Sequence, residues 1–144
     1  YPVKGYSVTI DVAGAAAPRV SLTDDEHKLV FSRLGDRLRV AGTAELNGYD
    51  NRLNAARCEA ILARAAALFP RAGDFQRAAR WCGLRPATPS NLPLIGATSV
   101  RNLYLNTGHG TLGWTLACGS AQLLADLMSA RAPDLDPAPY ALMR

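Results

Sequence analysis

The fold is decided by the ten-residue stretch NTGHGTLGWT at residues 106–115. Its three glycines have the G-x-G-x-x-G spacing of a turn that joins a strand to a helix and brings the backbone close to a ligand. The preceding residues 102–106 predict a short strand. The apolar, proline-free residues 113–128 predict a helix. The stretch is therefore expected to form a strand, a tight glycine turn and a helix.

The start of this predicted helix favours an electron-rich ligand. Free backbone amides at a helix N-terminus carry partial positive charge, and glycines let a ligand approach them closely. A complete dinucleotide fingerprint needs a second strand after the helix, but here a proline-rich tail over residues 133–139 follows. The pyrimidine edge of a flavin satisfies the chemistry of the turn. Tight packing of strand on helix, without any ligand, is the alternative interpretation.

A second motif lies upstream, in WCGLRPATP at residues 81–89. Prolines and glycines over residues 81–96 argue against a helix and suggest a path between two lobes, with the boundary near Thr88. Arg85 is followed by the rigid Pro86, and an arginine fork held in this way can bind a carboxylate through two parallel hydrogen bonds. A surface arginine or an internal ion pair is the alternative interpretation for Arg85.

The first half of the chain predicts a sheet followed by a helix. Residues 8–12 alternate between apolar and polar, and residues 28–34 and 37–43 read as two strands of a hairpin around Gly35 and Asp36. An apolar face over residues 51–69 predicts an amphipathic helix capped by Asp50 or Asn51 and ended by Pro70. Residues 13–18 are expected to form a small-residue connection, and the tail beyond residue 132 an irregular surface segment.

Composition excludes several classes of function. The 144 residues are 49% hydrophobic and 19% charged, which is typical of a globular protein rather than a disordered one. The net charge of +4 comes from scattered basic residues, so no nucleic-acid partner is expected. Residues 111–128 are interrupted by Gln122 and Asp126, which argues against a membrane span. The chain begins at Tyr1 without an initiator Met, so we expect a fragment of a longer protein.

Cysteine and histidine are too few and too widely spaced for a disulfide framework or a metal site. Three cysteines, at positions 58, 82 and 118, are expected to be buried thiols in a reducing, cytoplasmic setting. The two histidines, His27 and His109, have no paired ligand motif around them. The sequence thus predicts no bound metal.

Together the two motifs resemble the D-amino acid oxidase-like superfamily of flavoproteins. In that superfamily a Gly-x-Arg-Pro-x-Thr-Pro stretch, here residues 83–89, precedes a Gly-His-Gly-x-x-Gly turn, here residues 108–113. The segments YPVKGYSVT at residues 1–9 and AGTAELNGYD at residues 41–50 are similar to the small subunits of bacterial D-amino acid dehydrogenases. The resemblance covers nearly the whole chain.

This resemblance implies an FAD-dependent oxidoreductase that deaminates D-amino acids, D-alanine among them, to 2-oxo acids and ammonium. Electrons would pass to a quinone or another respiratory acceptor, with the protein cytoplasmic or peripheral on the inner membrane. The substrate-binding residues implied are Arg85 for the carboxylate, with Tyr6 and Tyr49. A role at the end of a strand is the alternative interpretation for Lys4 and Tyr6. The cofactor-binding residues implied are Lys4, Gly108, His109, Gly110, Thr111, Leu112, Gly113 and Thr115. No residue is assigned as a catalytic acid or base, and His109 is favoured as a structural residue of the turn.

The expected architecture is an α+β fold of two partial lobes. A mixed-sheet substrate lobe would occupy residues 1–88, and the C-terminal strand and helix of a Rossmann-like FAD-binding lobe would occupy residues 89–144. Without the N-terminal dinucleotide-gripping part, this stretch alone is expected to be inactive and to bind FAD poorly. Its exposed apolar surface favours a homodimer. The alternative functions are a glycine or sarcosine oxidase-like enzyme, and a binding or assembly module without redox activity.

Overall fold

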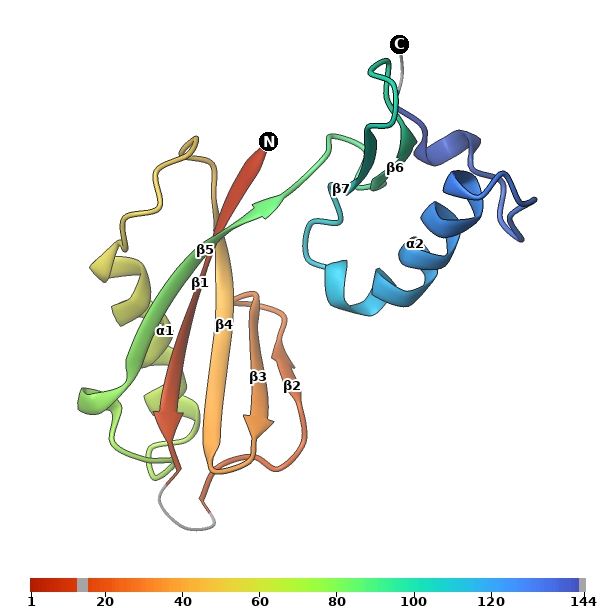
Figure 1. Cartoon of the computed structure of the whole chain (residues 1–144). Helices are drawn as coiled ribbons and strands as arrows, with labels where there is room; N and C mark the ends of the chain where they lie inside the picture. Colours follow the sequence, from red (N-terminus) through yellow and green to blue (C-terminus); the bar gives the residue numbers. More distant parts are fainter. Residues whose placement is uncertain (13–15, 143–144) are drawn as a thin grey trace. The chain divides into compact units, whose positions relative to one another are not determined.

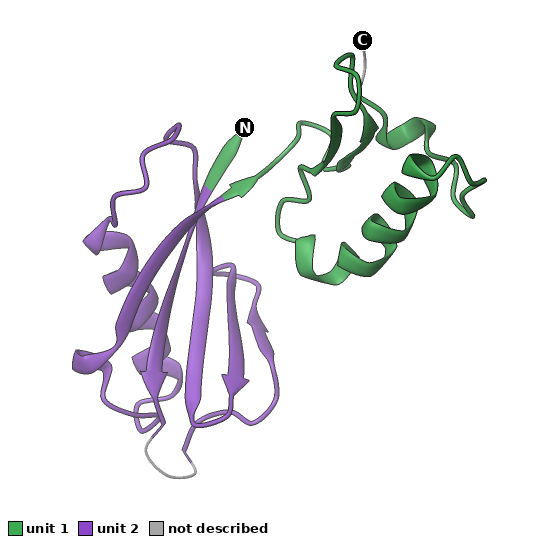
Figure 2. Ribbon diagram, in the orientation of Figure 1, with its two compact units in different colours: residues 1–3, 85–144 green, residues 4–84 purple. Residues whose placement is uncertain are grey.

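The computed structural model describes residues 1–12 and 16–142, which form two compact units (Figure 2). One unit comprises Lys4–Leu84. The other comprises Tyr1–Val3 together with Arg85–Arg144. The predicted connection over residues 13–18 lies partly outside the described residues. Strands and helices occur in both units, which confirms the α+β class.

A five-stranded sheet in the order β2-β3-β4-β1-β5 forms the unit Lys4–Leu84, and the helix α1 (Ala55–Leu68) lies against one of its faces (Figure 1). The registers of β1 with β4, β2 with β3, and β3 with β4 are antiparallel. Strands β1 and β5 run on at their ends into the other unit. The strands are β1 (Pro2–Asp11), β2 (Leu22–Asp24), β3 (Leu29–Leu34), β4 (Arg37–Glu45) and β5 (Ala79–Pro86).

The predicted hairpin is confirmed. Leu34 pairs with Arg37, which leaves Gly35 and Asp36 as a two-residue loop, and Gly35 adopts a φ of +60° that glycine tolerates without strain. The predicted strand over residues 8–12 is part of β1, which begins six residues earlier. Most of residues 2–8 are buried on both faces of the sheet, so their sequence lacks the alternation that marks a half-exposed strand.

The core of this unit lies between the sheet and α1. Alternate residues of three strands, including Ile10, Phe31 and Val40, pack against the buried face of the helix, which consists of Cys58, Ile61, Leu62 and Ala65. The rings of Phe31 and Phe69 meet edge to face with centroids 5.4 Å apart. Burial of Cys58 is as predicted. Cys82 is only half-buried and Cys118 is exposed, so the expectation of a buried thiol is wrong for Cys118.

The helix α1 starts later than its sequence predicts, and the predicted cap is wrong. Asn54 is the N-cap, and its side chain accepts a hydrogen bond from the Ala56 amide. The Asp50 carboxylate instead accepts bonds from the backbone and guanidinium of Arg52. Asp50 and Asn54 are both residue types that cap helices, but the Asp50 carboxylate is engaged by Arg52, and Asn54 is the cap. At the other end the helix stops at Leu68, two residues before Pro70.

Three strands were not predicted: β2, β5 and β6. β5 includes residues 81–86 of the glycine- and proline-containing stretch that we expected to be a non-helical path between two lobes. Position 83 of this strand requires glycine, because a β-carbon there would lie 2.3 Å from the Trp81 ring and leave no room for the indole. Pro86 is the last residue of β5, where a missing N–H is tolerated.

The other unit carries a two-stranded antiparallel sheet and a long helix. The strands are β6 (Leu94–Ala97) and β7 (Tyr104–Thr107), and α2 (Gly113–Met128) has the bounds that the sequence predicts. Ile95 and Leu123 are buried hydrophobic residues of this unit. The tail beyond residue 132 is irregular, as predicted, apart from one turn of 3-10 helix, η2 (Ala138–Tyr140). Among the described residues no helix is long and apolar enough to span a membrane.

Candidate functional site

The glycine turn between β7 and α2 is pinned by hydrogen bonds and close packing. Gly108 has a φ of +83°, and a β-carbon on it would lie 2.7 Å from the Thr88 methyl group. Gly110 has a φ of +55° with open space beside it. These are positions at which an L-residue other than glycine is strained. The turn therefore needs glycine at position 108 for both backbone conformation and contact, and at position 110 for conformation.

The structure brings together the two motifs that the sequence singles out. The Gly110 amide donates a 2.8 Å hydrogen bond to the Pro86 carbonyl, and Ala87 pairs with His109 in an antiparallel bridge. Arg85 is thus adjacent in sequence to a residue bonded to the turn, although residues 90–105 separate the two motifs along the chain. Arg85 is half-buried, and burial lowers the pKa of its guanidinium from its usual very high value.

His109 of the glycine turn is held by contacts with α2, the helix that follows the turn. Its Nε2 lies 2.9 Å from the hydroxyl of Ser120, a buried residue two turns into α2, and the Leu112 amide donates to the His109 carbonyl. Both contacts tie the turn to the helix.

The first turn of α2 is open to a ligand. The N-cap position is Leu112, and no side chain bonds the amides there. Thr111, Leu112 and Thr115 are exposed, while Gly113 is half-buried. Unpaired N–H groups at a helix start attract negative charge. This edge of the unit can therefore accept an electron-rich group alongside Gly110.

A second set of predicted residues lies in the unit Lys4–Leu84, where Lys4 and Tyr6 are only 2% and 1% exposed. The Tyr6 hydroxyl donates a hydrogen bond to Glu45 Oε2, and Lys4 Nζ lies 3.2 Å from the same oxygen. Lys4 Nζ also donates to the Arg52 carbonyl at 3.0 Å and lies 5.7 Å from the centre of the Tyr6 ring. Lys4 and Tyr6 thus share one carboxylate.

The electrostatics of this cluster are those of a compensated buried charge. The hydrogen bond from Tyr6, reinforced by Lys4 and Arg57, holds the pKa of Glu45 below its usual range. Burial and the Glu45 carboxylate together raise the pKa of Tyr6. Burial alone would lower the pKa of Lys4, but its bonds to Tyr6 and Glu45 outweigh that effect and raise it. At neutral pH the cluster therefore holds Glu45 as an anion and Lys4 as a cation.

Sequence reasoning missed Glu45 and Arg57 as members of this cluster. Arg57 extends from α1, and its Nε lies 3.4 Å from Glu45 Oε1. Glu45 falls within the segment 41–50 that carries the family resemblance, and this was the only feature of the sequence that could have pointed to Glu45. By contrast, Tyr49 lies outside the cluster, with 84% of its surface exposed.

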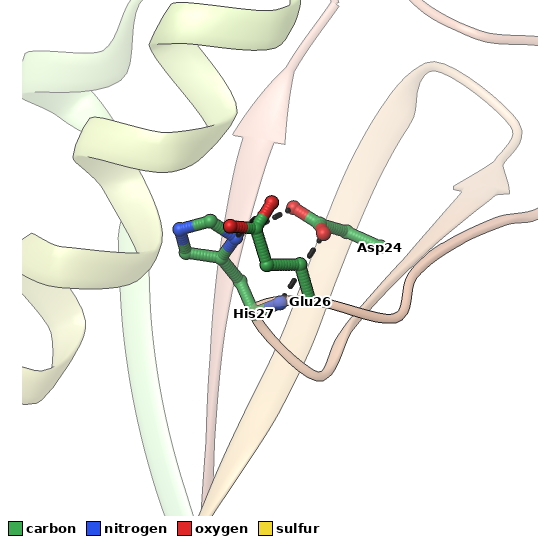
Figure 3. Close-up of side chains that lie close together, drawn as sticks. All are labelled: Asp24, Glu26 and His27. Atoms are coloured by element: carbon green, nitrogen blue, oxygen red, sulfur yellow. Dashed lines mark hydrogen bonds and ion pairs between the residues drawn. The ribbon is translucent and has the colours of Figure 1, made fainter.

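One further group of ionisable residues, drawn in Figure 3, lies at the end of β2. Ligand atoms of Asp24, Glu26 and His27 lie within 4.8 Å of one another. Asp24 is already engaged, since its Oδ1 accepts from the His27 amide and its Oδ2 lies 2.6 Å from Arg64 Nε. Glu26 and His27 are exposed. This group is an ion-pair network that ties the end of β2 to α1.

Comparison with known proteins places the chain in a family. The model of the family described as DAO, FAD dependent oxidoreductase, matches residues 1–127. The chain belongs to this family of flavin-dependent oxidoreductases. A D-amino acid dehydrogenase of Dechloromonas aromatica is 64% identical over 135 residues, which are 93% of this chain and 32% of that protein. One from Paramagnetospirillum magneticum is 63% identical over 131 residues, 90% of this chain and 31% of that protein. The chain thus spans about a third of the length of these relatives.

Solved structures agree with the family assignment. Glycine oxidase from Geobacillus kaustophilus superposes with a TM-score of 0.83 at 31% identity, covering 100% of this chain and 39% of that one. An L-amino acid deaminase from Proteus vulgaris superposes with a TM-score of 0.74 at 22% identity, covering 100% of this chain and 36% of that one, and shows the fold alone.

The residues at the glycine turn fit the ring edge of FAD. The donors here are backbone amides without a side-chain cap and the hydroxyl of the exposed residue Thr115. The open space at Gly110 leaves room beside them, so the turn suits the electron-rich pyrimidine edge.

Proposed function

We propose that the intact protein is an FAD-dependent D-amino acid dehydrogenase. In this reaction the D-amino acid loses two electrons and two protons, which forms a C=N double bond. Water then hydrolyses the imino acid to a 2-oxo acid and ammonium. The identities of 64% and 63% to proteins named D-amino acid dehydrogenase support this assignment. Bound FAD supplies the two-electron acceptor.

The observation that carries the proposal is the bond between the Gly110 amide and the Pro86 carbonyl. It holds Arg85, a cation suited to a substrate carboxylate, beside a turn suited to the flavin edge. Orientation of substrate against cofactor is the main contribution that a protein makes to such chemistry. In this proposal Arg85 anchors the carboxylate. The turn residues Gly108, His109, Gly110, Thr111, Leu112 and Gly113, together with Thr115, line the flavin.

In the unit Lys4–Leu84, the family resemblance assigns Lys4 to cofactor binding and Tyr6 and Tyr49 to substrate binding. Tyr49 presents an exposed ring to substrate, whereas Lys4 and Tyr6 are held below the surface by Glu45. We propose residues 1–88 as a substrate lobe and residues 89–144 as a flavin lobe. The electron acceptor is proposed to be a membrane quinone or another respiratory carrier, with the protein cytoplasmic and peripheral on the inner membrane.

D-alanine-dependent reduction of a dye by the intact flavoprotein tests the proposal directly. We expect the flavin absorbance to bleach when D-alanine is added without an acceptor, and dye to turn over when one is present. L-alanine is the matched control and should do neither. A flavin spectrum indifferent to all D-amino acids would contradict the assignment.

A glycine oxidase-like activity is the second candidate, because a glycine oxidase superposes on this chain with a TM-score of 0.83. Such an enzyme delivers its electrons to dioxygen and releases hydrogen peroxide. Peroxide produced from glycine in stoichiometric amounts would favour the oxidase. Dye or quinone reduction without peroxide would favour the dehydrogenase, and absence of bound flavin would favour a module without redox activity.

A further inference from the structure

The half-buried carboxylate of Glu45 joins three elements of the unit Lys4–Leu84. Tyr6 and Lys4 reach it from β1, with Lys4 Nζ at 3.2 Å, and Arg57 reaches it from α1 at 3.4 Å. The Arg57 Nε is itself buried and has no hydrogen-bond partner. Removing one partner of a buried ion pair leaves the other charge uncompensated. Glu45 therefore controls the position of both cations.

The Lys4 side chain connects this carboxylate to the loop of residues 46–54, which joins β4 to α1. Its Nζ donates to the Arg52 carbonyl at 3.0 Å. The Cys82 thiol donates to the neighbouring Asn51 carbonyl at 3.2 Å. The same loop exposes Tyr49 almost fully. The loop thus displays an aromatic side chain while the Lys4 and Cys82 side chains bond its backbone.

We propose that Glu45 is a positioning residue for the substrate site, because it holds the Lys4 ammonium against the backbone of the loop that presents Tyr49. This inference rests on the proposed function, in which Tyr49 contacts the substrate. Glu45 itself contacts neither substrate nor cofactor. Its effect passes through Lys4 to the Arg52 carbonyl, and from there to the conformation of residues 46–54.

The charges around Lys4 predict how loss of Glu45 would appear in a pH profile. Glu45 and Tyr6 face the ammonium directly, Arg57 approaches from α1, and Asp50 acts from the loop while it is bound to Arg52. Without the Glu45 carboxylate, Lys4 stays buried beside a second cation, and both effects favour its neutral form. Lys4 then loses its proton at a lower pH, and the anchored loop is released there.

Steady-state kinetics of the intact flavoprotein with D-alanine, measured across pH, test this inference. We expect Glu45→Gln to raise KM about tenfold, the effect of losing one hydrogen bond to a charged group, with kcat unchanged. In the wild type, KM should rise at the alkaline pH at which Lys4 loses its proton and releases the loop. In Glu45→Gln this rise should begin at a lower pH. Lys4→Met should raise KM to a similar extent and abolish that alkaline rise. The double variant should be no worse than Lys4→Met, because both changes break one connection.

Glu59→Gln is the matched control, because Glu59 lies at an exposed position of α1 and pairs with Arg80 of β5 at 2.7 Å. It should leave KM and its pH dependence as in the wild type. The inference is overturned if Glu45→Gln keeps the wild-type KM and alkaline limb. It is also overturned if the effects of Glu45→Gln and Lys4→Met multiply in the double variant.

Trypsin cleavage after Arg52 gives a readout that does not depend on activity. We expect faster cleavage at this bond in Glu45→Gln and Lys4→Met than in the wild type or Glu59→Gln, because the loop opens locally. Equal rates in all four proteins would overturn the anchoring role. A wild-type protein that ignores D-amino acids would overturn the proposed function alone, because the cleavage rates would still report whether Glu45 holds the loop.

Discussion

At the scale of single residues, Gly108 shows how a turn residue serves both conformation and contact. Its φ of +83° is strained for other residues, and a β-carbon on it would lie 2.7 Å from the Thr88 methyl group. Thr88 belongs to the arginine motif and Gly108 to the glycine turn, so this contact reinforces the backbone bonds between the two motifs.

We expect Gly108→Ala to destabilise the intact protein by at least about 1–2 kcal/mol, the cost of a left-handed backbone for an L-residue, with a lower flavin content. Thermal unfolding and the ratio of flavin to protein absorbance measure both effects. Gly119→Ala is the control, since Gly119 lies in α2 with nothing within 4 Å of an added β-carbon. It should be stabilising by up to about 1 kcal/mol. Equal melting temperatures for the two variants would contradict the prediction.

Arg85 is the residue on which substrate recognition depends in our proposal. We expect Arg85→Ala in the intact enzyme to lower kcat/KM for D-alanine by several-fold or more, because a substrate carboxylate loses its bidentate partner. Arg80→Ala is the control on the same strand, where Arg80 pairs with Glu59 at an exposed position. Its kcat/KM should match that of the wild type. An unchanged kcat/KM for Arg85→Ala would remove this residue from the site.

At the scale of elements, a bulge in β4 accounts for the position of Glu45. Lys4 pairs with Glu45 but Tyr6 pairs with Gly42, so Thr43 and Ala44 both lie opposite one residue of β1. Thr43 has a φ of +67°, which is strained for a β-branched residue. Simple alternation from Leu38 and Val40 would direct Ala44 toward α1. The extra residue directs Glu45 there instead.

The start of α1 gives a prediction that separates the structure from the sequence pattern. We expect Asn54→Ala to lower the free energy of unfolding by about 1 kcal/mol, because the Ala56 amide loses its acceptor. Asn51→Ala, at a position that the sequence also suggested as a cap, should change it by less than about 0.5 kcal/mol. Urea unfolding of both variants measures the difference. A larger loss for Asn51→Ala would place the helix start where the sequence pattern put it.

The ion pair between β2 and α1 predicts how stability responds to acid. Arg64 holds the pKa of Asp24 below its usual value, so the carboxylate stabilises the fold above about pH 4, its pKa in the unfolded chain, and this contribution is lost as the pH falls through the folded pKa. Asp24→Asn should therefore lower the urea midpoint at neutral pH and flatten its fall below about pH 4. Asp25→Asn, which removes an exposed carboxylate paired with Lys28, should do neither. Identical acid limbs for Asp24→Asn and the wild type would contradict this prediction.

At the scale of the whole molecule, α2 exposes much of its apolar surface. Trp114 is 95% exposed, and Leu112, Leu116 and Met128 are also exposed. Such a surface favours association, and we retain the homodimer of the 144-residue chain as a proposal.

We expect the 144-residue chain by itself to bind FAD weakly or not at all. The open first turn of α2 offers donors for the ring edge, and the chain spans about a third of the length of its relatives. Gel filtration after incubation with FAD, with absorbance followed at flavin and protein wavelengths, measures retention. The intact flavoprotein is the control and should keep its flavin. A stoichiometric yellow complex of the short chain would contradict the expectation.

Local chemistry made several parts of this protein predictable from its sequence. The hairpin around Gly35 follows from turn geometry, α2 from an apolar run opened by glycines, and the core face of α1 from helical periodicity. The motif around Arg85 and the glycine turn also indicated the flavoprotein family, which the family model and the relatives then confirmed.

Tertiary contacts decided the rest. The bond from Gly110 to Pro86 joins motifs that are distant in the chain, and no local pattern specifies such a pairing. Ion pairing of Asp50 with Arg52 left Asn54 as the cap of α1. Glu45 lies in the buried cluster only because a bulge in β4 reverses the alternation of its side chains. Periodicity in a sequence reports which residues can face the core, but register and packing between elements decide which of them do.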